Sequence, residues 1–141
     1  MKRVLVLMTG LVVALAGMLV APAEKSYAAQ DFYGPASFTT EDGKWDGNIT
    51  VDSTYRTVRL TIDQNLMRIY KATDIPKPWS PASLTARLCS ASSGNCTSFK
   101  TFGSSRTITF TNMLPAKYYI DIRDPWTDSY AVGKISARTE K

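Results

Sequence analysis

The segment RTITFTNMLPAKYYIDIR, residues 106–123, decides the fold class of this chain. Apolar and polar residues alternate on both sides of a short bend, and a period of two is typical of a half-buried β-strand. The polar positions before the bend are threonines, whose branched side chains favour strands. Pro115 fixes its own φ and holds Leu114 in extended geometry, so the chain turns here. We therefore expect a β-hairpin, with a strand, a tight bend and a second strand.

The inner face of this expected hairpin is the predicted centre of the core. Successive residues of a strand point to opposite faces, so Tyr118 is expected inside and its neighbour Tyr119 outside. The apolar residues that share the inner face are Ile108, Phe110, Leu114, Tyr118, Ile120 and Ile122.

The bend resembles a turn found in many secreted β-sandwich domains, including those appended to extracellular peptidases. In that pattern a leucine-proline-alanine-glycine turn precedes a strand that begins with two tyrosines. The match here is Leu114-Pro115-Ala116 and then Tyr118-Tyr119, with Lys117 in the place of the usual glycine. The resemblance covers only this turn and the start of the strand. It implies the β-sandwich fold class and no functional site.

The first residues have the layout of a secretory signal peptide, bacterial in style. Lys2 and Arg3 precede an uncharged apolar run over residues 4–21, and Ser26 and Ala28 are small residues at the positions that precede a cleavage site. The apolar run reaches only the lower limit of length for crossing a membrane, so an uncleaved anchor is the alternative.

Cleavage is predicted after Ala28, with a second candidate site at residues 21–23. Residues 29–141 then form one domain, large enough for a single two-layer core. We expect this domain to be secreted and extracellular, with no membrane span left after cleavage.

Short strands separated by turn signals fill the rest of the domain. Residues 31–37 are expected as an irregular lead-in that tucks its aromatic side chains against a sheet. Residues 64–73 fit either a helix or a strand, and the all-β surroundings favour a strand. Three prolines in residues 74–81 exclude a central strand and predict an extended loop that crosses between sheets. The other expected strands cover residues 37–40, 49–51, 55–63, 84–89, 95–102 and 129–139.

These features together predict an all-β fold, a single small antiparallel β-sandwich of roughly seven to nine short strands. Its edge strands can pair with those of another chain, which leaves the oligomeric state open.

Cys89 and Cys96 are predicted to form a disulfide, because a lone cysteine pair in an oxidising compartment is usually a structural staple. With residues 91–94 as a four-residue loop, the two cysteines lie directly opposite each other, and Gly94 supplies the positive φ that ends such loops. The same register places the pair on the outer side of the sheet with Arg87. A redox pair or a metal site is the alternative, although redox motifs have closer spacing and zinc needs further ligands.

The chain contains no histidine, which excludes the usual Ser-His-Asp and Cys-His catalytic sites and every histidine-ligated metal. We expect no enzymatic activity; a small hydrolase built on a carboxylate pair is the minor alternative. The net charge of +5 comes from lysines and arginines that are scattered singly. Nucleic-acid binding is therefore not expected, because it usually requires a clustered basic stripe.

Two groups of acidic residues lie in predicted loops or beside them. Calcium takes several oxygen ligands from such loops, but neither group has the alternating spacing of a dedicated calcium loop. Aspartates also favour turns for their local hydrogen bonds, and this interpretation is preferred, so no cofactor is expected. The weak calcium candidates are Asp121, Asp124 and Asp128, and the second group is Glu41, Asp42 and Asp46.

The three tryptophans, Trp45, Trp79 and Trp126, all fall in predicted loops. An exposed aromatic ring can stack on a sugar ring or anchor a protein partner, whereas a buried one would plug an open end of the sandwich. Tyr119, Trp126 and Tyr130 are a candidate surface group, because the strands that carry them are expected to be neighbours.

The sequence therefore predicts a secreted, non-catalytic binding domain whose first candidate ligand is a cell-envelope or matrix polysaccharide. The alternative is a secreted inhibitor or competition toxin that acts on a protein or a cell and inserts the proline-rich loop with Trp79. A row of exposed aromatic rings favours a sugar ligand, and a single protruding loop favours a protein target.

Overall fold

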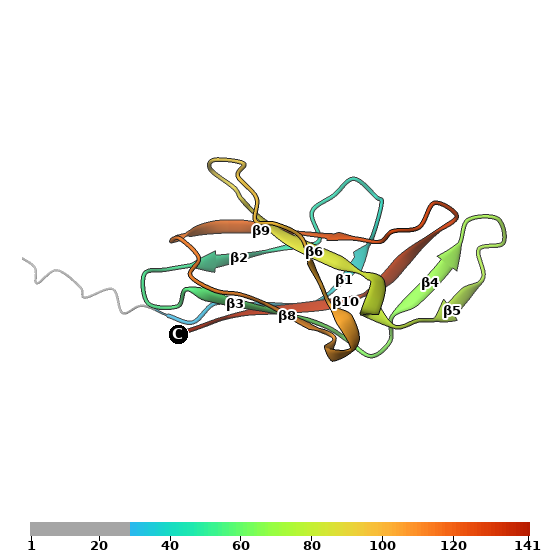
Figure 1. Cartoon of the computed structure of the whole chain (residues 1–141), viewed down its shortest axis with the longest axis horizontal. Helices are drawn as coiled ribbons and strands as arrows, with labels where there is room; N and C mark the ends of the chain where they lie inside the picture. The colour runs from blue at the N-terminus through green and yellow to red at the C-terminus, as the bar shows by residue number, and fades with distance from the viewer. Residues whose placement is uncertain (1–28) are drawn as a thin grey trace, which may run out of the picture.

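The computed structural model describes residues 29–141, and the predicted signal peptide lies outside this range. The described chain folds into two antiparallel sheets that face each other across one core (Figure 1). This confirms the predicted small all-β sandwich. The strands are β1 (Phe32–Thr39), β2 (Gly47–Val51), β3 (Thr57–Ile62), β4 (Met67–Tyr70), β5 (Pro76–Pro78), β6 (Thr85–Ser90), β7 (Lys100–Thr101), β8 (Thr107–Phe110), β9 (Ala116–Arg123) and β10 (Ser129–Glu140).

The larger sheet has the order β5-β4-β10-β3-β8, with β1 on the other side of β10. The smaller sheet has the order β2-β9-β6-β7. Two short 3-10 turns, Pro81–Ser83 and Gly103–Ser105, precede β6 and β8. Within residues 29–141 no helix has the length and apolar character needed to cross a membrane.

β10 is the central strand of the larger sheet. β1 pairs with one side of it, while β3 and β4 pair with the C-terminal and N-terminal halves of its other side. Between β3 and β4, residues 63–66 bulge out, and Leu66 packs into the space above Gly133 of β10. A Cβ at position 133 would lie 2.9 Å from Leu66 Cδ1 and 3.0 Å from the Phe38 ring, so a larger residue here would displace these side chains.

The predicted hairpin in residues 106–123 is wrong. β8 pairs with β3 in the larger sheet, and β9 pairs with β2 and β6 in the smaller one, so the bend is an arch between sheets. Alternation cannot distinguish the two arrangements, because in both of them each strand has one face towards the core. Within the arch Asn112 has a φ of 54°, and the Met113 N–H donates to the Arg56 carbonyl oxygen.

The predicted core is confirmed apart from one residue. Ile108, Phe110, Tyr118, Ile120 and Ile122 are buried. Leu114 is 69% exposed, and the preceding residue, Met113, is buried in its place at 7% exposure. The arch reverses the side-chain direction at this point, so the hairpin geometry assumed for Leu114 does not apply.

The prediction of an irregular lead-in over residues 31–37 is also wrong, because β1 already begins at Phe32. Its pairing with β10 is interrupted between Tyr33 and Ala36. Phe32 lies 65% exposed and is not tucked against a sheet, whereas Tyr33 packs against the core.

The proline-rich segment contains a strand, although a marginal one. Pro76–Pro78 pairs with β4 at the edge of the larger sheet, where a missing N–H can be tolerated. The chain then crosses to the smaller sheet after Trp79, as expected. Of the strand expected over residues 95–102, only β7 and a single bridge at Cys96 pair with β6.

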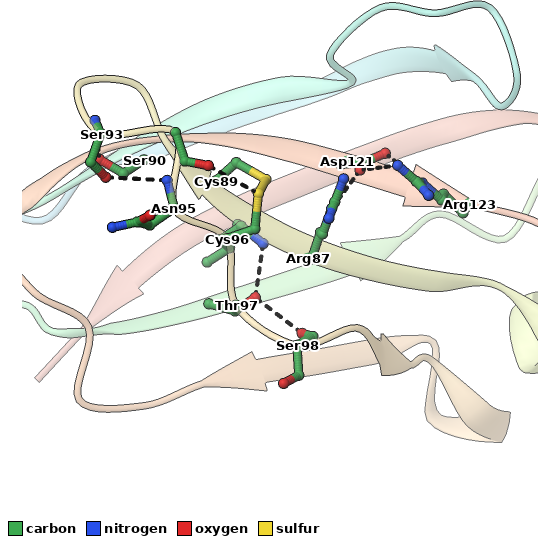
Figure 2. Close-up of a disulfide and its surroundings, with 12 residues drawn as sticks. Arg87, Cys89, Ser90, Ser93, Asn95, Cys96, Thr97, Ser98, Asp121 and Arg123 are labelled. Carbon is green, nitrogen blue, oxygen red and sulfur yellow. Dashed lines mark hydrogen bonds and ion pairs between the residues drawn. A yellow bond between two sulfur atoms is a disulfide. The ribbon is translucent and has the colours of Figure 1, made fainter.

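The predicted disulfide between Cys89 and Cys96 is present (Figure 2). The two residues face each other in an antiparallel bridge, and the Ser90 N–H donates to the Asn95 carbonyl oxygen at 2.8 Å. Gly94 has the expected positive φ, 74°. The disulfide thus closes the β6 turn on the outer side of the smaller sheet.

The arch leads to the first prediction, which compares two adjacent residues. Met113→Ala should lower the free energy of unfolding by about 2–3 kcal/mol, because it leaves a cavity in the core. Leu114→Ala should change it by less than about 0.5 kcal/mol, because this side chain is exposed. Urea unfolding followed by far-UV circular dichroism measures both. A larger effect at Leu114 would contradict the arch.

Candidate functional site

A pocket of about 400 Å³ lies where the loop between β1 and β2 meets the C-terminal half of β9. The loop contributes Trp45 and Asp46, and the strands β6 and β9 contribute charged side chains from the outer face of the smaller sheet. Five of the chain's twelve acidic residues line this pocket. It is therefore acidic, although the whole chain has a net positive charge.

Asp46 is the buried member of the pocket, with 7% exposure. Its backbone N–H donates to the Ile120 carbonyl oxygen at 2.9 Å, and its Oδ2 accepts from the Ile122 N–H at 2.7 Å. These bonds extend the β2–β9 ladder by one residue and hold the carboxylate against β9. From the sequence, Asp46 was assigned to a turn, but β2 begins directly after it at Gly47.

Burial raises the pKa of Asp46 to about 7. The hydrogen bond from the Ile122 N–H favours the carboxylate, but the negative charges of Asp42 and Asp121 add to the effect of burial. At neutral pH this side chain therefore exchanges between the acid and the carboxylate.

Asp121 has the opposite environment, because two arginines bind it (Figure 2). Arg87 Nε lies 2.7 Å and an Arg123 guanidinium nitrogen 3.2 Å from the same carboxylate oxygen. Both guanidinium groups also lie over the Phe99 ring, at 4.7 and 4.9 Å from its centroid. Charge and stacking together fix this wall of the pocket.

Trp45 stands beside the pocket as a half-exposed platform. Its ring stacks on Tyr119, with a centroid distance of 5.3 Å and an angle of 11° between the planes. Tyr119 projects from the outer face of β9, as predicted, and supports one side of the indole. Trp45 keeps 50% of its surface exposed, so it is not a plug of the core.

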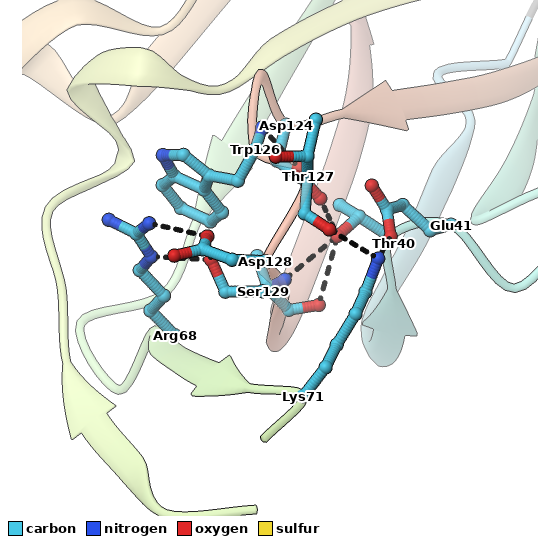
Figure 3. Close-up of polar contacts among 10 residues, drawn as sticks. Thr40, Glu41, Arg68, Lys71, Asp124, Trp126, Thr127, Asp128 and Ser129 are labelled. Atoms are coloured by element: carbon cyan, nitrogen blue, oxygen red, sulfur yellow. Dashed lines mark hydrogen bonds and ion pairs between the residues drawn. The ribbon is translucent and has the colours of Figure 1, made fainter. Parts of the chain in front are cut away.

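The other two tryptophans form a cage around Arg68 of β4. Figure 3 shows Trp126 beside Arg68. The guanidinium carbon lies 4.2 Å from the Trp126 ring centroid and 4.8 Å from those of Trp79 and Tyr70. Arg68 also donates to Ser129 Oγ at 2.7 Å and to Asp128 Oδ1 at 3.1 Å. The cage joins the β4–β5 hairpin to the loop between β9 and β10.

Lys71 connects that hairpin to the rim of the pocket (Figure 3). Its Nζ lies 2.6 Å from a Glu41 carboxylate oxygen and donates to the Thr127 carbonyl oxygen at 3.1 Å. The hydrogen bond to Glu41 raises the pKa of Lys71. Thr40 Oγ1 in turn donates to Asp124, so three loops are held together at this end of the molecule.

The three calcium candidates are engaged with other groups. Asp121 binds the arginines described above, Asp124 Oδ1 accepts from the Trp126 N–H at 2.9 Å, and Asp128 accepts from Arg68 and Ser129. In residues 29–141 no group of three or more potential ligands lies close enough to hold a metal ion. Asp124 thus makes the local turn hydrogen bond that the sequence favours over calcium binding.

The proposed surface group of Tyr119, Trp126 and Tyr130 does not form. β9 and β10 belong to different sheets, so the assumption that they are neighbours is wrong. Tyr119 contacts Trp45, whereas Trp126 contacts Trp79 and Arg68. Tyr130 lies on the outer face of the opposite sheet, since it alternates with the buried residues of β10.

Sequence reasoning missed Arg68, Arg87, Arg123 and Phe99. Alternation places Arg87 and Arg123 on an outer face, but their shared partner depends on the pairing of β6 with β9. No local pattern indicates that Arg68 meets aromatic rings from two distant loops.

The raised pKa of Asp46 predicts a specific dependence of stability on pH. The folded protein binds a proton at Asp46 near pH 7, whereas the unfolded chain binds it only near 3.8. Between these values the folded state holds the additional proton, so stability falls as pH rises, by up to about 1.4 kcal/mol per unit. Asp46→Asn should remove this decline and keep the bond from Ile122. Urea unfolding of both proteins from about pH 4 to pH 7 tests this; identical slopes would contradict it.

The cage predicts that Arg68 stabilises the hairpin locally. Arg68→Gln should cost the β4–β5 pairing about 2 kcal/mol, which corresponds to roughly 30-fold faster hydrogen exchange at residues 67–79. Arg59→Gln is the matched control, because Arg59 pairs with Glu140 on an outer sheet face away from the cage. Equal protection of the hairpin in both variants would show that the cage does not hold it.

Comparisons with known proteins assign no family to this chain. No family model matches it, and neither the curated proteins nor the solved structures include a match. The pocket, the Trp45 platform and the Arg68 cage are therefore the features that bear on function.

Proposed function

We propose that this protein is a secreted, non-catalytic binding domain whose ligand is a cell-envelope or matrix polysaccharide. The observation that carries the proposal is the position of Trp45, an exposed indole supported by Tyr119 at the side of an acidic pocket. The proposed ligand places one sugar ring on the indole and the next in the pocket.

The platform suits a sugar because the two faces of a pyranose ring are partly apolar. An aromatic ring that is already held in place loses little conformational entropy when such a face stacks on it. Tyr119 provides this support by covering the other side of Trp45. A flexible, unsupported tryptophan would bind more weakly.

The pocket supplies the polar half of such a site. Sugar hydroxyls donate to carboxylates and accept from guanidinium groups, and both kinds of group lie together at Asp121, Arg87 and Arg123. A few oriented polar groups beside an apolar surface are the usual composition of a small-ligand site.

The ion pairs of Asp121 with Arg87 and Arg123 also argue against hydrolysis. A glycosidase uses two carboxylates that are free to reach the scissile bond. Here Asp121 is held by two arginines, and Asp46 is buried and bound to the backbone of β9. Binding without catalysis requires neither carboxylate to move.

The alternative function, action on a protein or cell target, is supported by the β4–β5 hairpin. This hairpin extends past the strands of the smaller sheet at one end of the molecule (Figure 1), and every residue from Lys71 to Ser80 is exposed. Ile75 in its loop is one of the large exposed apolar residues. A protruding segment held at its base by a cage would suit insertion into a partner.

Affinity electrophoresis through gels that contain purified cell-envelope or exopolysaccharide fractions tests the main proposal. Trp45→Ala should weaken the retardation about tenfold, because stacking contributes roughly 1–1.5 kcal/mol. Phe32→Ala is the matched control, since Phe32 is an aromatic on the other sheet that is even more exposed than Trp45. Equal loss in both variants, or no retardation of the wild type by any fraction, would reject the proposal. If Ile75→Ala lost binding to a protein or cell target and Trp45→Ala did not, the alternative function through the β4–β5 hairpin would be favoured.

A further inference from the structure

We propose that the pocket beside Trp45 selects amino sugars, and that Asp46 receives the free ammonium group of the bound residue. This inference rests on the proposed function, since it names the class of polysaccharide that the same site would take.

One oxygen of the Asp46 carboxylate has no hydrogen-bond donor among the described residues. Its Oδ2 accepts the Ile122 N–H, but its Oδ1 accepts no hydrogen bond from any residue in the range 29–141. Asp46 is nevertheless buried and lines the pocket. Among the described residues Oδ1 is not one of the fully buried atoms that lack a partner, so it reaches the solvent of the pocket and can accept from a ligand there.

Most of the cations around the pocket are already paired with a carboxylate. Arg87 and Arg123 both bind Asp121, and Lys71 binds Glu41. Among the lining residues this leaves Lys44, which is exposed and forms no ion pair with the described chain. Three of the four cations at or beside the pocket are therefore paired with carboxylates other than Asp46, and Asp46 itself forms no ion pair with the described chain.

Negative charge surrounds Asp46 in the pocket. Asp42 from the same loop and Asp121 from β9 oppose its ionisation, and Asp124 at the end of β9 also lines the pocket. The raised pKa of Asp46 agrees with this surplus of negative charge. A bound cation would relieve both the burial and the repulsion.

The arrangement of the acidic residues favours an organic ammonium group over a divalent metal ion. The acidic residues form no cluster that could hold a metal ion within residues 29–141, so a divalent metal is not favoured. A primary ammonium group carries three N–H donors, of which one can bind the Asp46 carboxylate while solvent in the open pocket accepts from the others. A hexosamine joins such a group to a sugar ring that can stack on Trp45, so it matches both halves of the site.

The test uses two matched oligosaccharides, the hexamer of β-1,4-linked glucosamine and the hexamer of its N-acetylated form. Isothermal titration calorimetry near neutral pH should give about tenfold tighter binding of the free amine to the wild type. Asp46→Asn should reduce this preference to within about twofold. Asp63→Asn, which removes one exposed charge outside the pocket, should keep the preference.

The outcomes separate the two proposals. If both hexamers bind equally well and Trp45→Ala weakens both, polysaccharide binding stands and the selection of amino sugars is overturned. If Asp63→Asn removes the preference as fully as Asp46→Asn does, the effect is one of overall charge, and the role of Asp46 is rejected. If neither hexamer binds and the polysaccharide fractions also fail, the proposed function is rejected as well.

Discussion

The pairing of β10 on both of its sides is the constraint on which the rest of the molecule depends. Its last residues hold β3, its first residues hold β4, and β1 runs along the opposite side. β1 ends at Thr39 opposite Val132, which determines where the loop with Trp45 and Asp46 begins. β4 ends opposite Ser129, which brings Arg68 beneath the tryptophans. The pocket and the cage are thus both built outwards from one strand.

Most of the charged side chains in this region lie in contact with an opposite charge. Lys71 and Glu41, Arg68 and Asp128, and the two arginines on Asp121 are opposite charges in contact. Such partly exposed pairs contribute little to stability individually, but they fix the positions of three loops relative to β9. Asp46 has no cationic partner, although it is the most buried of these acids. This carboxylate without a cationic partner is the group on which the proposed selection of amino sugars depends.

Local rules in the sequence were sufficient for the fold class and for the disulfide. The alternation at Ile108 and Ile120 reports which side of a strand is buried, and the spacing of Cys89 and Cys96 reports a short turn. Neither rule identifies the strand that lies alongside, so the arch was predicted as a hairpin, and Leu114 was placed in the core. Which strands pair depends on interactions over the whole chain, and a local sequence pattern does not contain that information.

The candidate site was predictable only in part, for the same reason. That Trp45 lies in a loop and that Tyr119 points outwards follow from the sequence, but their stacking depends on the pairing of β2 with β9. Asp46 resembled an ordinary turn aspartate because it precedes a glycine. Its burial arises from the strand that begins directly after it, and its pKa follows from that burial.

The arch between β8 and β9 also has a consequence for folding kinetics. Because adjacent strands enter different sheets, most strand pairs join residues far apart in the chain, and the relative contact order is high. Such topologies fold slowly compared with helical domains of equal size. The larger sheet cannot close before residues 129–140 are available, since every other strand of that sheet except β5 and β8 pairs directly with them. During synthesis the larger sheet can therefore be completed only after the last strand has emerged.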